Sequence, residues 1–144
     1  MNDRYLYRAK QADNGEWVEG YLIHAKKDCY ICEKPYECMD EYSSLNGQSY
    51  GFGGFKLVDA FTICQCTGLE DKNGKLIWEN DVLVGYIDDI YPENPTYTRV
   101  IWYKNGFYTK EKGSYDILPL DEFDEKHFEV CGNIFDEGSE NIGK

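Results

Sequence analysis

The chain has 144 residues, of which 42% are hydrophobic and 16% aromatic, and its formal net charge is −12. This length fits one domain, or two very small ones sharing a core, and the apolar content is enough for a packed interior. The acidic balance argues against direct binding to a nucleic-acid backbone, because phosphate contacts need clustered lysine and arginine.

The first half of the chain predicts strands joined by turns, since its aromatic residues favour strands and its glycines favour turns. Residues 5–10 predict a first strand and residues 16–23 a second, with Asp13-Asn14-Gly15 as the turn of a hairpin. Residues 24–55 are less regular and predict an irregular insertion. Within it we expect a short helix around 36–45, and a glycine-rich stretch, 47–55, that either packs back on the surface or covers a ligand. Residues 56–63 predict another strand.

The most informative stretch is residues 67–84, which predicts a tight turn followed by a strand. Asp71, Asn73 and Gly74 have the positive-φ tolerance and the side-chain-to-backbone hydrogen bonding of a turn. Leu76, Trp78, Val82 and Val84 then alternate on one face, and Asn80 breaks the series at a second turn.

The remaining residues predict a loop, a hairpin, a helical turn and a last strand. The loop covers residues 88–95 and the hairpin residues 98–109, with Asn105-Gly106 at its tip. Residues 121–128 predict a helical turn anchored by Phe123 and Phe128, and residues 129–135 a final strand.

We therefore predict a mainly β protein with little helix, organised in two parts. Residues 1–66 form an N-terminal β-hairpin region that contains the irregular insertion 24–55. Residues 67–136 form a small barrel that closes its own edges, and residues 137–144 form a polar tail.

Three segments together resemble a known family. Residues 67–82 read Thr-Gly-Leu-x-Asp-Lys-Asn-Gly-Lys-x-Ile-x-Glu-x-Asp-Val, which resembles the signature of the YopX family of phage and prophage proteins. Residues 7–22, with Tyr-Arg-Ala and then Trp-Val-x-Gly-x-Leu, are similar to the family's opening hairpin. Residues 130–136, Val-x-Gly-Asn-Ile-Phe-Asp, are similar to its closing strand. The signature positions that we single out are Thr67, Gly68, Leu69, Asp71, Asn73, Gly74, Glu79, Asp81, Gly132 and Asn133.

The resemblance implies a phage- or prophage-encoded protein that acts in the cytoplasm of a bacterial host. It implies a largely β structure whose C-terminal part is an SH3-like barrel, and self-assembly into an oligomer. It implies no reaction, so no catalytic residues follow from it. Cys66 departs from the family pattern, because an aromatic residue commonly precedes the Thr-Gly pair there.

The six cysteines offer one candidate metal site. Cys29-x-x-Cys32 could supply two thiolates from one turn, and Cys64-x-Cys66 would present two more on one face of a strand. The alternative is that these are reduced thiols, as expected in a chain without a signal peptide. The knuckle lacks its customary glycines, so we expect thiols and predict no metal and no cofactor.

No other constellation predicts catalysis. Asp71-x-Asn73-Gly74 has its glycine too early for an EF-hand calcium loop. Glu79 and Asp81 could form a carboxylate pair, but residues of this kind more often hold a turn by bonding backbone amides. The sequence therefore predicts that the protein is not an enzyme.

Two functions remain open, with an enzyme or a zinc-dependent scaffold as a third reading. The first is a non-catalytic protein–protein interaction or assembly module, which the abundant tyrosine and tryptophan favour as interface anchors. The second is an acidic nucleic-acid mimic or accessory factor that acts on a host DNA- or RNA-binding protein. No membrane partner is expected, because no apolar run approaches the roughly 20 residues that span a bilayer.

Overall fold

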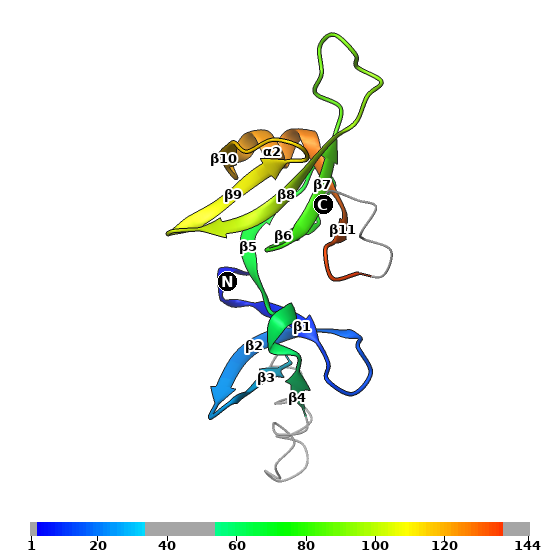
Figure 1. Ribbon diagram of the computed structural model, residues 1–144. Coiled ribbons are helices and arrows are strands. Elements are labelled where there is room, and N and C mark those ends of the chain that lie inside the picture. The colour runs from blue at the N-terminus through cyan, green and yellow to red at the C-terminus, as the bar shows by residue number, and fades with distance from the viewer. Residues whose placement is uncertain (1–2, 34–53, 137–144) are drawn as a thin grey trace. The chain divides into compact units, whose positions relative to one another are not determined.

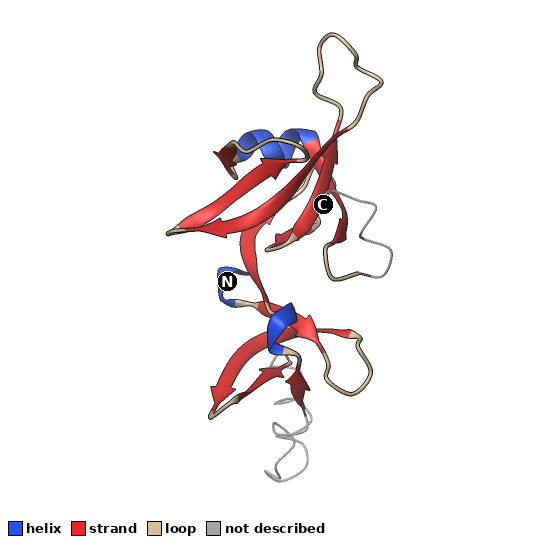
Figure 2. Cartoon of the chain, in the orientation of Figure 1, coloured by secondary structure: helices blue, strands red, loops and turns tan. Residues whose placement is uncertain are grey.

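The computed structural model describes residues 3–33 and 54–136 (Figure 1). The chain divides into two compact units, Met1–Gln65 and Cys66–Lys144, which we call the N-terminal and C-terminal units. Strands dominate the described residues of both units, so the prediction of a mainly β fold is confirmed (Figure 2). The predicted helix around 36–45, the glycine-rich residues 47–53, Cys38 and the tail 137–144 lie outside the described residues.

The N-terminal unit is an antiparallel sheet with the strand order β4-β3-β2-β1, continued by the start of β5. Its elements are η1 (Asp3–Tyr5), β1 (Tyr7–Lys10), β2 (Trp17–Ala25), β3 (Asp28–Cys32), β4 (Phe55–Val58), η3 (Ala60–Thr62) and the first residues of β5 (Cys64–Glu70). The predicted opening hairpin is confirmed, because β1 pairs with β2 from Tyr7 opposite Gly20 to Lys10 opposite Trp17. The core of this unit is a small apolar cluster of Ala9, Val18, Ile31 and Val58.

Two predictions about this unit are wrong. The region 24–55 is not irregular at its start, because β2 extends to Ala25 and β3 follows directly after a turn at Lys26, whose φ is 57°. Residues 56–63 are not one strand, because the chain leaves β4 at Asp59 and forms η3. The Asp59 carboxylate accepts a hydrogen bond from the Phe61 amide at 3.0 Å, and this cap favours the helical turn over a longer strand.

The C-terminal unit contains a five-stranded antiparallel sheet with the order β10-β9-β8-β7-β11, and a β5–β6 pair. Its elements are β6 (Leu76–Trp78), β7 (Asp81–Gly85), β8 (Thr96–Tyr103), β9 (Gly106–Glu111), β10 (Ile117–Pro119), α2 (Glu122–His127) and β11 (Phe128–Asn133). Among the described strands this sheet is open, with β10 and β11 at its two edges, so the predicted closure of the edges is not observed. The predicted helical turn is confirmed as α2. This helix begins with a capping box between Asp121 and Asp124.

The core of the C-terminal unit refines the predicted alternation. The break at Asn80 is confirmed, since this residue has a φ of 69° between β6 and β7. The predicted face is only partly confirmed, because Trp78 and Val82 are buried but Leu76 and Val84 are only half-buried. Ile77 and Leu83, at the other parity, are fully buried as well. Ile77 and Leu83 join Val100 and Phe128 in the apolar cluster that lies at the centre of this unit.

The hairpin of β8 and β9 differs from its prediction by one residue. Tyr103 pairs with Gly106, so the two loop residues are Lys104 and Asn105 rather than Asn105 and Gly106. Lys104 takes the positive φ, 58°, that the prediction assigned to the Asn-Gly pair. Cross-strand pairing of Trp102 with Phe107 is consistent with this register, because aromatic pairs stabilise antiparallel strands.

Candidate functional site

The signature turn is organised by the carboxylate of Asp71, which is only 6% exposed. Its Oδ1 accepts hydrogen bonds from the amides of Asn73 and Lys75, both at 2.9 Å, and closes the turn on itself. Its Oδ2 accepts a hydrogen bond from the amide of Val130 in β11 at 2.8 Å. One side chain therefore shapes the turn and attaches it to a strand 59 residues further along the chain.

The pKa of Asp71 is lowered from its ordinary value. Burial raises this pKa, but the amides of Val130, Lys75 and Asn73 and the charge of Lys75 act in the opposite direction and outweigh it. The ionised carboxylate is therefore the form that the fold stabilises. Its hydrogen bonds are all to backbone amides, which is the arrangement of a structural acceptor and not of a general base.

The second part of the signature is a buried contact between Asp81 and Asn133, which are 0% and 1% exposed. Asp81 accepts a hydrogen bond from the amide of Trp78 at 2.8 Å through Oδ2 and one from the Asn133 side-chain amide at 3.0 Å through Oδ1. The same amide of Asn133 donates to the carbonyl of Glu79 at 3.2 Å. The predicted role of Asp81 in holding the turn before β7 is thus confirmed, whereas Glu79 contributes its backbone carbonyl.

The other signature residues also shape backbone. Thr67 is buried and donates its hydroxyl to the carbonyl of Ile77 at 2.7 Å, across the β5–β6 pair. Gly68 and Gly74 both have a φ of 83°, which favours glycine. Leu69 packs on the apolar cluster, Asn73 donates to a Glu129 carboxylate oxygen at 2.8 Å, and Gly132 follows the register shift in β11.

The signature is therefore a hydrogen-bonded scaffold that joins β5, β6 and β7 to β11. Its buried polar groups bond to one another and to the backbone, as groups removed from water must. We call the residues Thr67, Asp71, Asp81 and Asn133 the signature network. The arrangement positions strands and presents no nucleophile next to a base.

The four cysteines of the candidate zinc site are not brought together. Cys29 and Cys32 lie on strand β3 at positions of opposite parity, so their side chains leave opposite faces of the sheet. Cys64 and Cys66 share a parity on β5, as predicted, and both are fully buried. In residues 3–33 and 54–136, no three histidine, cysteine, aspartate or glutamate side chains are grouped so as to hold a metal ion.

A pocket of about 430 Å³ lies within the C-terminal unit and was not predicted. Strands β8, β9 and β10 and the start of α2 provide most of its lining. Acidic side chains dominate the charged part of that lining, and the lining contains no lysine, arginine or histidine. The acids are Glu111, Asp116, Asp121 and Asp124.

Asp124 has a fixed place in this pocket. Its Oδ2 accepts a hydrogen bond from the amide of Asp121 at 3.0 Å, while the Asp121 carboxylate accepts one from the amide of Phe123, also at 3.0 Å. Burial raises the pKa of Asp124, and the negative charge of Asp121 raises it further. The pocket therefore holds a carboxylate that lacks a compensating positive charge in its lining.

Thr98 also lines the pocket and is 7% exposed. Its hydroxyl Oγ1 is buried and makes no hydrogen bond within the described part of the chain. Such a group has an unfavourable free energy unless something supplies a partner, because it loses water on folding. Thr98 lies directly opposite Glu111 in the β8–β9 ladder, so their side chains leave the same face of the sheet.

One sequence signal could have indicated the pocket. Thr96 and Thr98 share strand parity with the core residue Val100, and Thr109 and Glu111 share it with Phe107. Polar residues at the parity of the core mark the point where a buried face opens. When the pairing of the strands is not known, these residues only weaken the alternation of polar and apolar positions along each strand.

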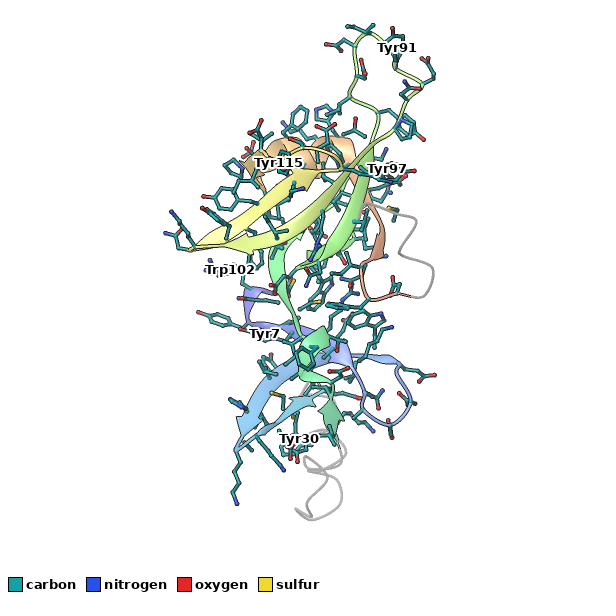
Figure 3. The ribbon with its side chains drawn as sticks, in the orientation of Figure 1. Tyr7, Tyr30, Tyr91, Tyr97, Trp102 and Tyr115 are labelled. Atoms are coloured by element: carbon teal, nitrogen blue, oxygen red, sulfur yellow. The ribbon has the colours of Figure 1, made fainter. Side chains whose placement is uncertain are left out.

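Aromatic side chains are exposed at the other end of the β8–β9 hairpin. Trp102, labelled in Figure 3, is 49% exposed and contacts Phe107 edge-on, with ring centroids 5.0 Å apart. Tyr103 is 44% exposed and contacts Tyr108 in the same way at 5.9 Å. Trp102 and Tyr103 are adjacent on a strand, so the hairpin presents an aromatic side chain on each face. We call Trp102, Tyr103, Phe107 and Tyr108 the hairpin aromatics.

Within the described residues, no helix is long and apolar enough to cross a membrane. No curated protein matches the sequence. The model of the YopX protein family matches residues 6–139, which is most of the chain and includes all three segments that carry the resemblance. The chain therefore belongs to the YopX protein family.

Proposed function

We propose that this protein is a non-catalytic protein–protein interaction or assembly module, encoded by a phage or prophage and acting in the cytoplasm of a bacterial host. The observation that carries the proposal is the pair of half-exposed rings, Trp102 and Tyr103, at the β8–β9 hairpin. Tryptophan and tyrosine are the residues most enriched among those that dominate binding energy at protein interfaces.

The hairpin aromatics suit this role because they are held in place before binding. Edge-on ring contacts fix Trp102 against Phe107 and Tyr103 against Tyr108. Side chains that are already ordered lose less conformational entropy when a partner covers them. The signature network, by contrast, is buried and has no surface to offer a partner.

The alternative of an acidic nucleic-acid mimic would need carboxylates at regular spacing along one face of the protein. Four carboxylates of the C-terminal unit instead line one pocket. This grouping favours an interaction module that takes a basic group over a surface that imitates a phosphate backbone.

We also propose that the C-terminal unit is an SH3-like barrel. The order β11-β7-β8-β9-β10 supports this proposal, since the last strand of such barrels pairs with the first. The short α2 between β10 and β11 occupies the place of the helical turn that precedes the last strand. An experimental structure of the full chain tests this, and β7 and β8 running straight without the bend that folds the barrel would contradict it.

Site-specific photo-crosslinking tests the interaction function. A benzophenone amino acid at position 102 is expected to crosslink a second copy or a partner protein in host cells that carry the phage or prophage. The same group at Phe61, which is highly exposed in the N-terminal unit, is the matched control and is expected to crosslink much less. Equal, background-level crosslinking at both positions, with a monomer in sedimentation at high concentration, would overturn the proposal.

A further inference from the structure

We propose that the acidic pocket of the C-terminal unit binds the side chain of an arginine from a partner polypeptide. This inference rests on the proposed interaction function and names the chemical group that the partner supplies. The lining residues of the pocket run from Ile87 to Phe128, and all of them belong to the C-terminal unit.

Charge defines what the pocket can take. Its lining includes Glu111, Asp116, Asp121 and Asp124 but no basic side chain, and the C-terminal half of the chain from residue 67 carries a net −9. A cation in this position would gain Coulomb energy from several carboxylates, more than at an open surface because part of the solvent is excluded. A neutral or anionic group would have to compete with water without that gain.

The spread of the carboxylates favours an organic cation over a metal ion. They line a space of about 430 Å³, yet no three acidic, histidine or cysteine side chains in the described residues converge as metal ligands. A guanidinium is planar and has five N–H donors, so it can bond several separated acceptors at once. A lysine ammonium is a compact point charge and would reach fewer of them.

Thr98 supplies a second, independent indication. Its buried hydroxyl oxygen has no hydrogen-bond partner in the described residues, and the residue belongs to the pocket lining. The N–H of a guanidinium in the pocket would supply the hydrogen-bond partner that the hydroxyl oxygen of Thr98 lacks. Glu111, opposite Thr98 in the ladder, would accept from the same group.

Apolar side chains at the pocket favour a polypeptide as the source of the cation. Leu118 and Phe123, both lining residues, are 68% and 50% exposed. They can cover the aliphatic stem of an arginine and the backbone that carries it. A free small cation would leave these two side chains in water. Leu118 also belongs to β10, an edge strand of the sheet, beside which an extended peptide has room to lie.

The test is a titration of the ¹⁵N-labelled full chain, followed by amide chemical shifts in 150 mM NaCl. The probe is the peptide acetyl-Ala-Ala-Arg-Ala-Ala-amide, and its matched control replaces arginine by citrulline, which has the same shape and no charge. We expect the arginine peptide to shift the amides of Thr98, Thr109, Glu111 and Asp124. We expect the affinity of the citrulline peptide to be at least about tenfold lower, since citrulline loses a charge-assisted hydrogen bond.

Substitutions in the pocket lining test whether the arginine peptide binds there. Asp124→Asn keeps an oxygen acceptor for the Asp121 amide while removing the charge, and Glu111→Gln changes a residue outside the capping box, in case the first variant does not fold. Each is expected to weaken arginine-peptide binding about fivefold to tenfold. Asp89→Asn removes an exposed charge from the loop after β7, outside the lining, and is expected to bind as the wild type does.

Three results would overturn the inference. Shifts that are absent from the pocket, or equal for the arginine and citrulline peptides, would show that the pocket does not select this charge. Tighter binding of spermidine or of Mg²⁺ at the same residues would assign the pocket to a free cation. A lysine peptide that binds as tightly as the arginine peptide would show that the pocket does not select a guanidinium. None of these results affects crosslinking at position 102, so the proposed interaction function is tested separately.

Discussion

The two units of this chain are both antiparallel sheets, but they are stabilised in different ways. The N-terminal unit has a small core of apolar side chains, Ala9, Val18, Ile31 and Val58. The C-terminal unit adds to its apolar cluster a set of buried polar side chains that bond to one another, with Asp81 fully buried at its centre. Apolar packing is insensitive to protonation, whereas a buried carboxylate is not.

The signature positions singled out from the sequence all lie in the C-terminal unit, and this difference gives a physical reason for their place. Apolar cores tolerate exchanges of similar volume, so they leave a weak mark in sequence. A buried carboxylate and its amide partner tolerate few exchanges, because either one alone would be left without a hydrogen bond. The residues that identify the family are therefore structural, and the candidate binding features lie beside them in the same unit.

The largest expected effect is the loss of Asp81. Asp81→Ala leaves the Trp78 amide and the Asn133 side chain without this acceptor inside the protein. We expect the free energy of unfolding of the C-terminal unit to fall by about 3–5 kcal/mol. Urea unfolding followed by tryptophan fluorescence measures this in a Trp17→Phe background, where the remaining tryptophans, Trp78 and Trp102, both belong to this unit. Asp89→Ala, at an exposed loop position, is the control, and an equally stable Asp81→Ala would contradict the assignment.

A substitution of Gly20 is expected to act on the N-terminal unit instead. A Cβ at Gly20 would collide with the backbone carbonyl of Cys32, which no side-chain rotation relieves. Gly20→Ala is therefore expected to destabilise this unit by about 2 kcal/mol, with Trp17 as its fluorescent reporter. Gly106→Ala meets nothing closer than the Tyr108 ring at 3.7 Å and should be close to neutral. If Gly20→Ala, like Gly106→Ala, leaves the free energy of unfolding unchanged from the wild type, β2 and β3 can move apart at Gly20 without loss of stability.

The contribution of Asp71 to the stability of the C-terminal unit is expected to depend on pH. The pKa of Asp71 is lowered in the fold, so its contribution to stability is complete above the unfolded-state pKa of about 3.9 and disappears as the pH falls through the folded value. Asp71→Asn should lower the free energy of unfolding by about 1–2 kcal/mol at pH 7 and much less at pH 2. Urea unfolding at both pH values measures the difference. An equal loss at pH 2 and pH 7 would mean that the charge of Asp71 is not what the turn uses.

The smallest expected effect has the opposite sign. Thr98→Val replaces a buried hydroxyl that has no hydrogen-bond partner by a methyl group of the same shape. We expect the C-terminal unit to gain about 1 kcal/mol. Thermal unfolding compares this variant with Thr109→Val, which changes another buried threonine of the pocket lining, on β9. A loss of stability in Thr98→Val would show that the hydroxyl has a partner in solution.

Local patterns predicted those elements whose signals lie within a few residues. The opening hairpin, the turn at 71–74, the break at Asn80 and the capped helix α2 all follow from turn and cap chemistry. The role of Asp81 as a backbone acceptor was also predictable, because its amide partner is three residues away.

What the sequence could not predict depends on contacts between distant residues. Asp71 reaches Val130, and Asn133 reaches Asp81, across more than 50 residues. The acidic pocket requires the register of β8 and β9, which puts Thr98 opposite Glu111. The strand predicted over 56–63 failed for a different reason, since a cap at Asp59 competed with strand pairing.

The central claim is that the signature network holds the C-terminal unit together and takes no part in binding. Amide hydrogen exchange of the full chain, read by mass spectrometry for the wild type and Asp81→Ala, tests it most directly. We predict that Asp81→Ala loses protection in residues 66–136 and keeps it in strands β1 to β3. Wild-type protection throughout residues 66–136 in this variant, together with lost crosslinking at position 102, would contradict the claim and make the network part of the binding site.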